Sequence, residues 1–115
     1  MARHNDLGKK GEEIAANFLK KWSKYFTKKL AFYKSEIDII FLDENILVLA
    51  EVKTRSTSAH GNPEEFISDK KLSLYLDVAE EYLKENKMDN EIRFDIVSIV
   101  YYSEKPIIKY IKDAF

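Results

Sequence analysis

The chain has 115 residues, a length that fits one domain over residues 1–115 rather than two. Because 45% of its residues are hydrophobic, it can fill one core, which argues against a disordered protein. It has no Cys and only two His, which excludes disulfides, thiolate zinc sites and cysteine nucleophiles. Its longest apolar runs, residues 39–42 and 46–50, are too short to cross a membrane, and its first residues lack the apolar segment of a secretory signal. We therefore expect a cytoplasmic protein without a membrane partner.

The spacing of apolar residues predicts two helices and five strands. In chain order these are a helix over 6–23, strands over 24–33, 36–42 and 46–54, a helix beginning after Ser68, and strands over 91–101 and 107–111. Ser68 is a typical N-cap residue, because its hydroxyl can accept a hydrogen bond from the first turn. A polar loop over 55–67 precedes this helix. The order α-β-β-β-α-β-β predicts an α/β fold in which a mixed β-sheet is flanked by helices, with the last strand at an edge.

The second and third predicted strands form a hairpin whose side chains alternate between two faces. One face of the first of these strands is entirely apolar and carries Ile37, Ile39 and Phe41. The opposite face carries Asp38, and on the next strand the matching face carries Glu51 and Lys53. These faces coincide if the connecting loop has two or four residues. A two-residue loop pairs Asp38 directly with Glu51, whereas a four-residue loop makes them diagonal neighbours.

Two carboxylates side by side in a sheet repel each other, so a purely structural pair would be destabilising. A bound Mg²⁺ (or Mn²⁺) removes that problem, since it takes one or two carboxylates together with water and phosphate oxygens. Lys53 could hold a nucleophilic water or offset charge on a phosphate. A plain surface pair between Glu51 and Lys53 is the alternative, but it does not explain why Asp38 lies beside them.

The first helix carries one more carboxylate at the border of its apolar face. Glu12 lies between apolar positions, with Gly8 one turn earlier on the same side and Gly11 directly before it. Small residues there allow another chain or a ligand to come close. The alternative is that Glu12 reaches water from the edge of the apolar face.

Charge is distributed unevenly along the chain. Residues 1–35 hold nine basic and three acidic residues, for a charge of +6, and the remainder carries −7. A basic lobe on a nearly neutral protein can bind a phosphate backbone locally, with Lys9 and Lys10 as candidate contacts. The alternative is a solvated, lysine-rich helix face.

Several short motifs occur in an order that resembles a known family. They are Gly8-x-x-Gly11-Glu12 with Ala15 and Leu19, Glu36-Ile37-Asp38, Ala50-Glu51-Val52-Lys53-Thr54-Arg55, Arg93-Phe94-Asp95-Ile96 and the closing Ile111-Lys112-Asp113-Ala114-Phe115. This pattern resembles the PD-(D/E)xK nuclease superfamily with its restriction-endonuclease-like fold. It is most similar to the YraN-like predicted endonucleases, which in turn resemble archaeal Holliday-junction resolvases.

The resemblance implies metal-dependent hydrolysis of phosphodiester bonds in DNA, including branched DNA. It implies Asp38 and Glu51 as metal ligands, Lys53 as the catalytic lysine, and Glu12 as the helix carboxylate that completes the metal site or its water shell. A homodimer with two active sites would suit a branched substrate.

Two further basic residues are candidate phosphate contacts, with a solvated surface position as the alternative for each. Arg55 opens the polar loop, and Lys71 lies in the first turn of the second helix, where backbone N–H groups also favour anions. Arg93 and Asp95 share a strand face and are expected to pair with each other rather than to act in catalysis.

Two other functions compete with the nuclease interpretation. A non-catalytic nucleic-acid-binding or adaptor protein that keeps the nuclease fold would not need metal, and its affinity would fall steeply with salt. A KH-like RNA module is suggested by Gly8-Lys9-Lys10-Gly11, although here this sequence lies within a helix pattern. That module would give Asp38 and Glu51 no role.

Overall fold

The computed structural model describes residues 2–22, 26–32, 35–55, 68–101 and 105–114, with side chains over 9–21, 37–55, 68–101 and 105–114. Its elements are α1 (Ala2–Leu19), a short 3-10 turn η1 (Lys20–Trp22), β1 (Phe26–Phe32), β2 (Ser35–Asp43), β3 (Ile46–Arg55), α2 (Asp69–Glu85), β4 (Glu91–Tyr101) and β5 (Pro106–Ile111). This order confirms the predicted α/β arrangement. No helix within the described residues is long and apolar enough to span a membrane.

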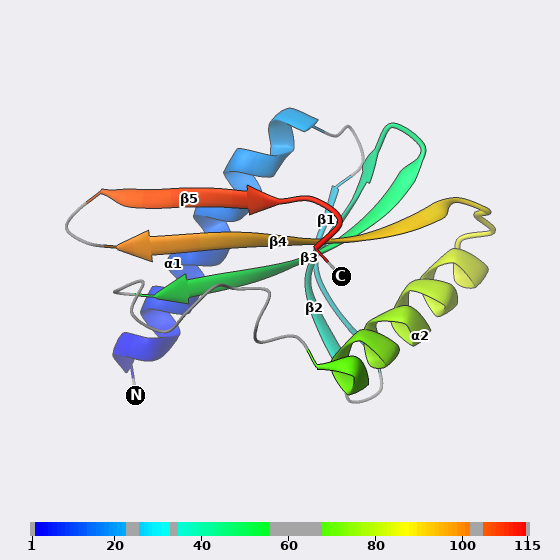
Figure 1. The fold of residues 1–115 in the computed structure, drawn as a ribbon, viewed down its shortest axis with the longest axis horizontal. Coiled ribbons are helices and arrows are strands. Elements are labelled where there is room, and N and C mark those ends of the chain that lie inside the picture. Colours follow the sequence, from blue (N-terminus) through cyan, green and yellow to red (C-terminus); the bar gives the residue numbers. More distant parts are fainter. Residues whose placement is uncertain (1, 23–25, 33–34, 56–67, 102–104, 115) are drawn as a thin grey trace.

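The strands form one mixed sheet in the order β1-β2-β3-β4-β5, with β5 at an edge as predicted (Figure 1). Neighbouring strands are antiparallel except β3 and β4, which are parallel. A parallel pair needs a crossover connection, and the segment that contains α2 supplies it. Asp38 lies on β2, and Glu51 and Lys53 lie on β3, so these three residues are near the centre of the sheet.

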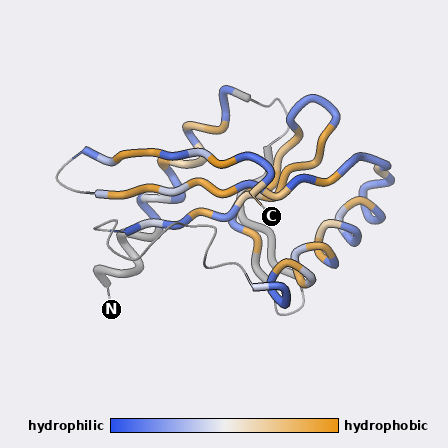
Figure 2. Tube along the Cα trace, viewed as in Figure 1, coloured by the Kyte–Doolittle hydropathy of each residue, from blue (hydrophilic) through white to orange (hydrophobic). Residues whose placement is uncertain are grey.

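The two helices cover opposite faces of the sheet. On β3, Val48 and Ala50 pack with the α1 residues Ala15 and Leu19. Their neighbours on the strand pack instead with α2, as members of a cluster that contains Leu47, Leu49, Tyr75, Val78 and Ala79. Because successive side chains of a strand point to opposite faces, α1 and α2 must lie on different sides. Figure 2 shows this pattern as largely apolar strands between helices that alternate polar and apolar residues.

The first helix begins at Ala2, four residues earlier than predicted, and its helical path ends in η1 at Trp22. Ala2 and Arg3 are good helix formers, and no Gly or Pro precedes Gly8, so nothing in the sequence stops the helix from extending to the start of the described chain. Ser68 is the N-cap of α2, as predicted, and its side chain accepts a hydrogen bond from the Lys71 N–H over 3.1 Å.

The hairpin between β2 and β3 has a two-residue turn, Glu44–Asn45, with Glu44 at φ 57°. The ladder runs from Asp43–Ile46 to Ile39–Ala50 and ends there. One prediction for this hairpin is wrong. Ile37 does not pack with Ile39 on the α1 side but belongs to the cluster under α2. The two strands separate beyond Ile39 while β2 continues to pair with β1, so this end of β2 packs under α2 and away from the α1 side of β3 (Figure 1).

Candidate active site at the end of β3

The predicted acidic pair lies where β2 separates from β3. Extending the hairpin register by one step beyond Ile39–Ala50 places Asp38 opposite Glu51, as the two-residue loop predicts. In the same register Val52 would face Ile37. The two strands no longer pair at that point, and the Asp38 Oδ2 accepts the hydrogen bond of the Val52 N–H instead, over 2.9 Å. One oxygen of Asp38 is thereby fixed against the backbone between Glu51 and Lys53.

Glu51 is a buried carboxylate with two lysine neighbours. Its side chain is only 6% exposed. The Lys71 Nζ donates to Oε1, and the Lys53 Nζ lies 3.4 Å from the same oxygen. The other oxygen, Oε2, is buried and has no hydrogen-bond partner. A buried carboxylate oxygen is normally hydrogen-bonded, because leaving it without a partner costs free energy. Both cations therefore neutralise one side of Glu51, and the opposite side is a free acceptor.

These residues fit a hard divalent cation in the chemistry of their donors. Carboxylate oxygens are what Mg²⁺ and Mn²⁺ prefer, and Glu51 Oε2 offers a buried oxygen that nothing in the described chain satisfies. No group of three His, Cys, Asp or Glu residues comes together within the part of the chain that the structure describes. The residues that would hold a cation are accordingly Glu51 and Asp38, with water and phosphate oxygens completing the shell.

Close packing brings α1 to the same end of β3. A Cβ atom added at Gly11 would lie 2.0 Å from Thr54 Oγ1 and 2.9 Å from Thr54 Cβ, so only glycine fits there. The close approach expected at the glycines of the first helix is thus made by β3 itself. Glu12 follows Gly11 and is half-buried, so it belongs to the turn of α1 that lies against Thr54, but it does not join Asp38 and Glu51 in a cluster of three carboxylates. α1 covers the sheet face opposite to α2.

The predicted phosphate contacts lie in different surroundings. Lys9 and Lys10 are exposed on α1, next to Gly11, and the Lys10 Nζ lies 5.6 Å from the centroid of the Tyr101 ring. Arg55 is half-buried at the end of β3. Lys71, expected to face a phosphate, contacts Glu51. Beyond Arg55, the polar loop over 55–67 lies outside the described residues, as does the side chain of Glu36.

A second polar cluster lies elsewhere, on the α1 side of β4, and confirms the predicted pairing of Arg93 with Asp95. Asp95 is fully buried and accepts from Arg93 Nε over 2.8 Å and Nη2 over 2.7 Å, from the Tyr110 hydroxyl, and from the Asp113 N–H over 2.9 Å. Its hydrogen bond raises the pKa of the Arg93 guanidinium. Burial, followed by the bond to Asp95, raises the pKa of the Tyr110 hydroxyl. Arg93 Nη1 also pairs with Asp43 over 3.1 Å.

The profile of the uncharacterised protein family UPF0102 matches residues 11–99. The UPF0102 proteins of Christiangramia forsetii and Flavobacterium psychrophilum are 41% and 44% identical to this chain over 116 residues, which cover all of it and 98% of each relative. The chain belongs to family UPF0102. A third relative, from Flavobacterium johnsoniae, is 40% identical over 120 residues, again with 98% of the relative covered. UPF0102 is the YraN-like, restriction-endonuclease-like group, so the resemblance seen in the motifs is confirmed.

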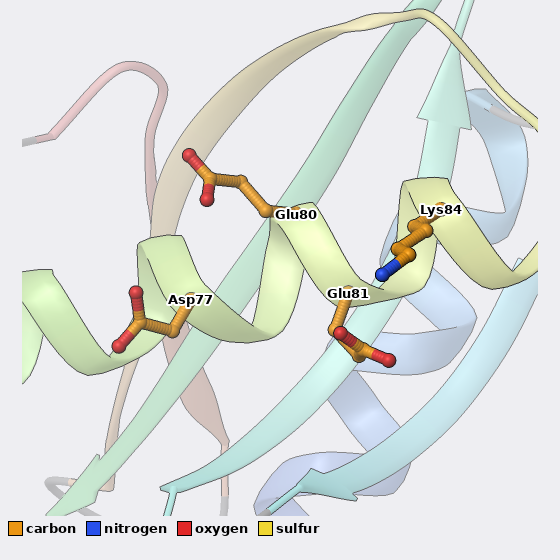
Figure 3. Close-up of a pocket in the computed structure, with 4 residues that line it drawn as sticks. All are labelled: Asp77, Glu80, Glu81 and Lys84. Atoms are coloured by element: carbon orange, nitrogen blue, oxygen red, sulfur yellow. The ribbon is translucent and has the colours of Figure 1, made fainter.

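In this UPF0102 chain, sequence reasoning missed the contact between Lys71 and Glu51. The N-cap at Ser68 predicts that Lys71 lies in the first turn of α2, but nothing in the sequence says which strand that turn approaches. It also missed a pocket on α2 that is lined by Asp77, Glu80, Glu81 and Lys84 (Figure 3). Three acidic residues there give the outward side of α2 a negative character, in contrast to the lysines at its first turn.

Proposed function

We propose that this UPF0102 chain is a metal-dependent endonuclease that hydrolyses phosphodiester bonds in DNA. The observation that carries the proposal is Glu51, a buried carboxylate whose Oε2 has no partner, beside Asp38 and within 3.4 Å of the Lys53 Nζ. A structural ion pair would use both carboxylate oxygens, whereas a site for a cation leaves one oxygen free.

Each residue has a distinct role in the proposed reaction. Glu51 and Asp38 would hold Mg²⁺ or Mn²⁺, and Glu12 on α1, which does not form a cluster with them, would act through the water shell of the cation. A cation bound there supplies Lewis-acid chemistry, because it offsets the negative charge that develops on the phosphate. Lys53 is held beside Glu51 on the same strand, where its ammonium can orient a water or bind a phosphate oxygen. The Val52 N–H holds the Asp38 carboxylate at this end of β3.

Charge on the surface supports an approach of DNA from the end of β3. Lys9 and Lys10 directly precede Gly11, which touches Thr54, so their exposed ammonium groups belong to that end of the sheet. The pocket with Asp77, Glu80 and Glu81 lies further along α2 and repels phosphates (Figure 3). The DNA would therefore contact α1 and the last residues of β3, with Arg55 among the contacts, rather than the outward side of α2.

The experiment that tests this proposal is cleavage of labelled linear, flapped and four-way-junction DNA in Mg²⁺, in Mn²⁺ and in EDTA. We expect cleavage only with a divalent cation, and its loss in Glu51→Gln and in Lys53→Met. Glu80→Gln is the matched control, since it removes an exposed carboxylate of α2 outside the site. Preference for the four-way junction together with a dimer in sedimentation would assign branched DNA as the substrate and a homodimer as the active form. Absence of cleavage in every metal condition would contradict the proposal.

A second function, a non-catalytic nucleic-acid-binding or adaptor protein, is favoured by one observation. Lys71 and Lys53 already neutralise Glu51, so the carboxylate has counter-charges without a metal. This function predicts that neither EDTA nor Glu51→Gln changes the binding of DNA. It also predicts that the logarithm of the binding constant falls linearly with the logarithm of the salt concentration. Binding of that kind without any cleavage would replace the nuclease proposal.

A further inference from the structure

The contact between α2 and Glu51 points to a role for Lys71 that the proposed nuclease chemistry does not by itself require. We propose that Lys71 is a resident counter-cation of Glu51, which a divalent metal must displace from the carboxylate in order to bind. This inference rests on the proposed function, because it assigns Glu51 to the metal. It makes Lys71 a positioning residue that controls when the site accepts its cation.

The geometry around Glu51 separates two positions for a cation. Lys71 and Lys53 both lie at Oε1, and Oε2 is buried without a partner. Burying a carboxylate that is only 6% exposed costs free energy unless a positive charge pairs with it. Lys71 meets this need directly through a hydrogen bond, whereas the Lys53 Nζ is 3.4 Å away. In the metal-free protein Lys71 is therefore the principal charge partner of Glu51.

A divalent cation on Glu51 would be close to both ammonium groups, and like charges at such distances repel strongly in a poorly solvated site. Lys71 is able to move away. Its side chain is 34% exposed, and a lysine has a flexible four-carbon stem. While it contacts Glu51, its Nζ also lies 5.7 Å from the centroid of the Tyr75 ring, so the ammonium can keep this favourable contact when it leaves the carboxylate. Tyr75 is buried and packs against Phe94, so the position of its ring is fixed.

Competition of this kind lowers the apparent affinity of the site for metal. If Lys71 is paired with Glu51 in about 90% of the molecules, only the remaining tenth can bind the metal. The apparent dissociation constant for the metal then rises on the order of ten-fold. Once displaced, the ammonium of Lys71 remains beside the site, where a phosphate is its natural partner. The predicted phosphate contact of Lys71 and its observed contact with Glu51 would then belong to the metal-bound and metal-free states respectively.

The test is binding of Mn²⁺ alone, measured by electron paramagnetic resonance on the full chain without DNA. We expect Lys71→Met to bind Mn²⁺ about ten-fold more tightly than wild type, and Lys71→Arg to remain near wild type because it keeps the competing charge. Lys70→Met is the matched control: Lys70 is the exposed neighbour in the same turn, so its removal should change the affinity by less than about two-fold. An unchanged or weaker affinity in Lys71→Met would overturn the inference.

A second readout needs no metal. In EDTA, Lys71→Met should lower Tm relative to Lys70→Met, because Glu51 loses its main charge partner, and saturating Mn²⁺ should remove most of that difference. A purely structural tie between α2 and β3 would instead lower Tm equally with and without Mn²⁺. Failure of the proposed function looks different again. If Glu51→Gln leaves the binding of Mn²⁺ unchanged, or if wild type binds none, the metal site itself is refuted. If Mn²⁺ binding depends on Glu51 but Lys71→Met does not change it, only the role of Lys71 as counter-cation is refuted.

Discussion

The carboxylate of Asp38 accepts a hydrogen bond from the backbone N–H of Val52 over 2.9 Å, at the point where the ladder between β2 and β3 ends. A side chain thus takes the place of the carbonyl that the register would assign to Ile37. The same carboxylate group satisfies β3 with Oδ2 and is proposed to bind a cation. Structure and chemistry therefore depend on different properties of Asp38, namely an acceptor oxygen and a negative charge.

This double role predicts that two substitutions of Asp38 will separate stability from activity. Asp38→Asn keeps an acceptor for Val52, so its free energy of unfolding should stay within about 0.5 kcal/mol of wild type. Asp38→Ala leaves the half-buried N–H without its partner and should lose about 1–2 kcal/mol. Both variants lose the charge, and metal-dependent cleavage should fall roughly 100-fold or more. Urea unfolding and a cleavage assay measure the two effects, and an active Asp38→Asn would refute the assigned role.

The contact between Gly11 and Thr54 predicts a helix that an otherwise favourable substitution will weaken. Ala is a better helix former than Gly by about 1 kcal/mol. At Gly11, however, the new Cβ would lie 2.0 Å from Thr54 Oγ1, and overpacking of this kind costs about 1–3 kcal/mol. We expect Gly11→Ala to lower the free energy of unfolding by about 1 kcal/mol.

Two companion variants isolate this clash. Asn17→Ala changes an exposed position of the same helix and should be neutral or slightly stabilising. Thr54→Ala removes Oγ1 and Cγ2, so Gly11→Ala should cost less in that background. Thermal and urea unfolding of wild type, Gly11→Ala, Thr54→Ala and the double variant measure the coupling between the two positions. A stabilised Gly11→Ala would mean that α1 does not press on β3 as described.

The cluster around Asp95 predicts how stability changes at high pH. The pKa of Tyr110 is raised by burial and by its bond to Asp95, so the folded protein keeps this proton where the unfolded chain loses it. Its contribution is complete below the ordinary tyrosine pKa of about 10 and is lost as the pH rises from there towards the raised value. Tyr110→Phe should cost about 1 kcal/mol at neutral pH and make the decline above about pH 10 shallower.

Urea unfolding at neutral pH and at several alkaline values checks this expectation. Tyr82→Phe is the control, since Tyr82 is a half-buried tyrosine of α2 outside the cluster. The difference in free energy of unfolding between wild type and Tyr110→Phe should shrink as the pH rises, by at most about 1.36 kcal/mol for each pH unit. If the free energies of unfolding of wild type and Tyr110→Phe change in parallel with pH, the Tyr110 hydroxyl does not hold its proton through Asp95.

Much of the hairpin could be predicted from the sequence, because alternation is a property of every strand. Asp38, Glu51 and Lys53 were expected on one face, and the two-residue turn at Glu44–Asn45 places Asp38 opposite Glu51 in the extended register. Ile37 was expected to pack with Ile39 but packs under α2, because β2 separates from β3 at this point while it stays paired with β1. The sequence contains no signal for the point where β2 separates from β3.

The surroundings of Glu51 were less predictable for a different physical reason. Lys53 is near in sequence, so strand geometry brings it to the same face. Lys71 is 20 residues away, and its contact with Glu51 depends on where packing places the first turn of α2. Local patterns predicted that turn and its cap correctly but carried no information about the tertiary position of the helix.

The cap of α2 predicts a coupling between Ser68 and Lys71 that can be measured without metal. Ser68 Oγ accepts from the Lys71 N–H over 3.1 Å, and the Lys71 side chain reaches Glu51 from the same turn. Ser68→Ala should lower the free energy of unfolding by about 1 kcal/mol. In a Lys71→Met background the loss should be smaller by about 0.5 kcal/mol, because only the cap and not the ion pair is then disturbed. Ser73→Ala, at an exposed position further along α2, should be close to neutral in both backgrounds. Equal losses from Ser68→Ala with and without Lys71 would show that the cap supports the helix alone and does not order the partner of Glu51.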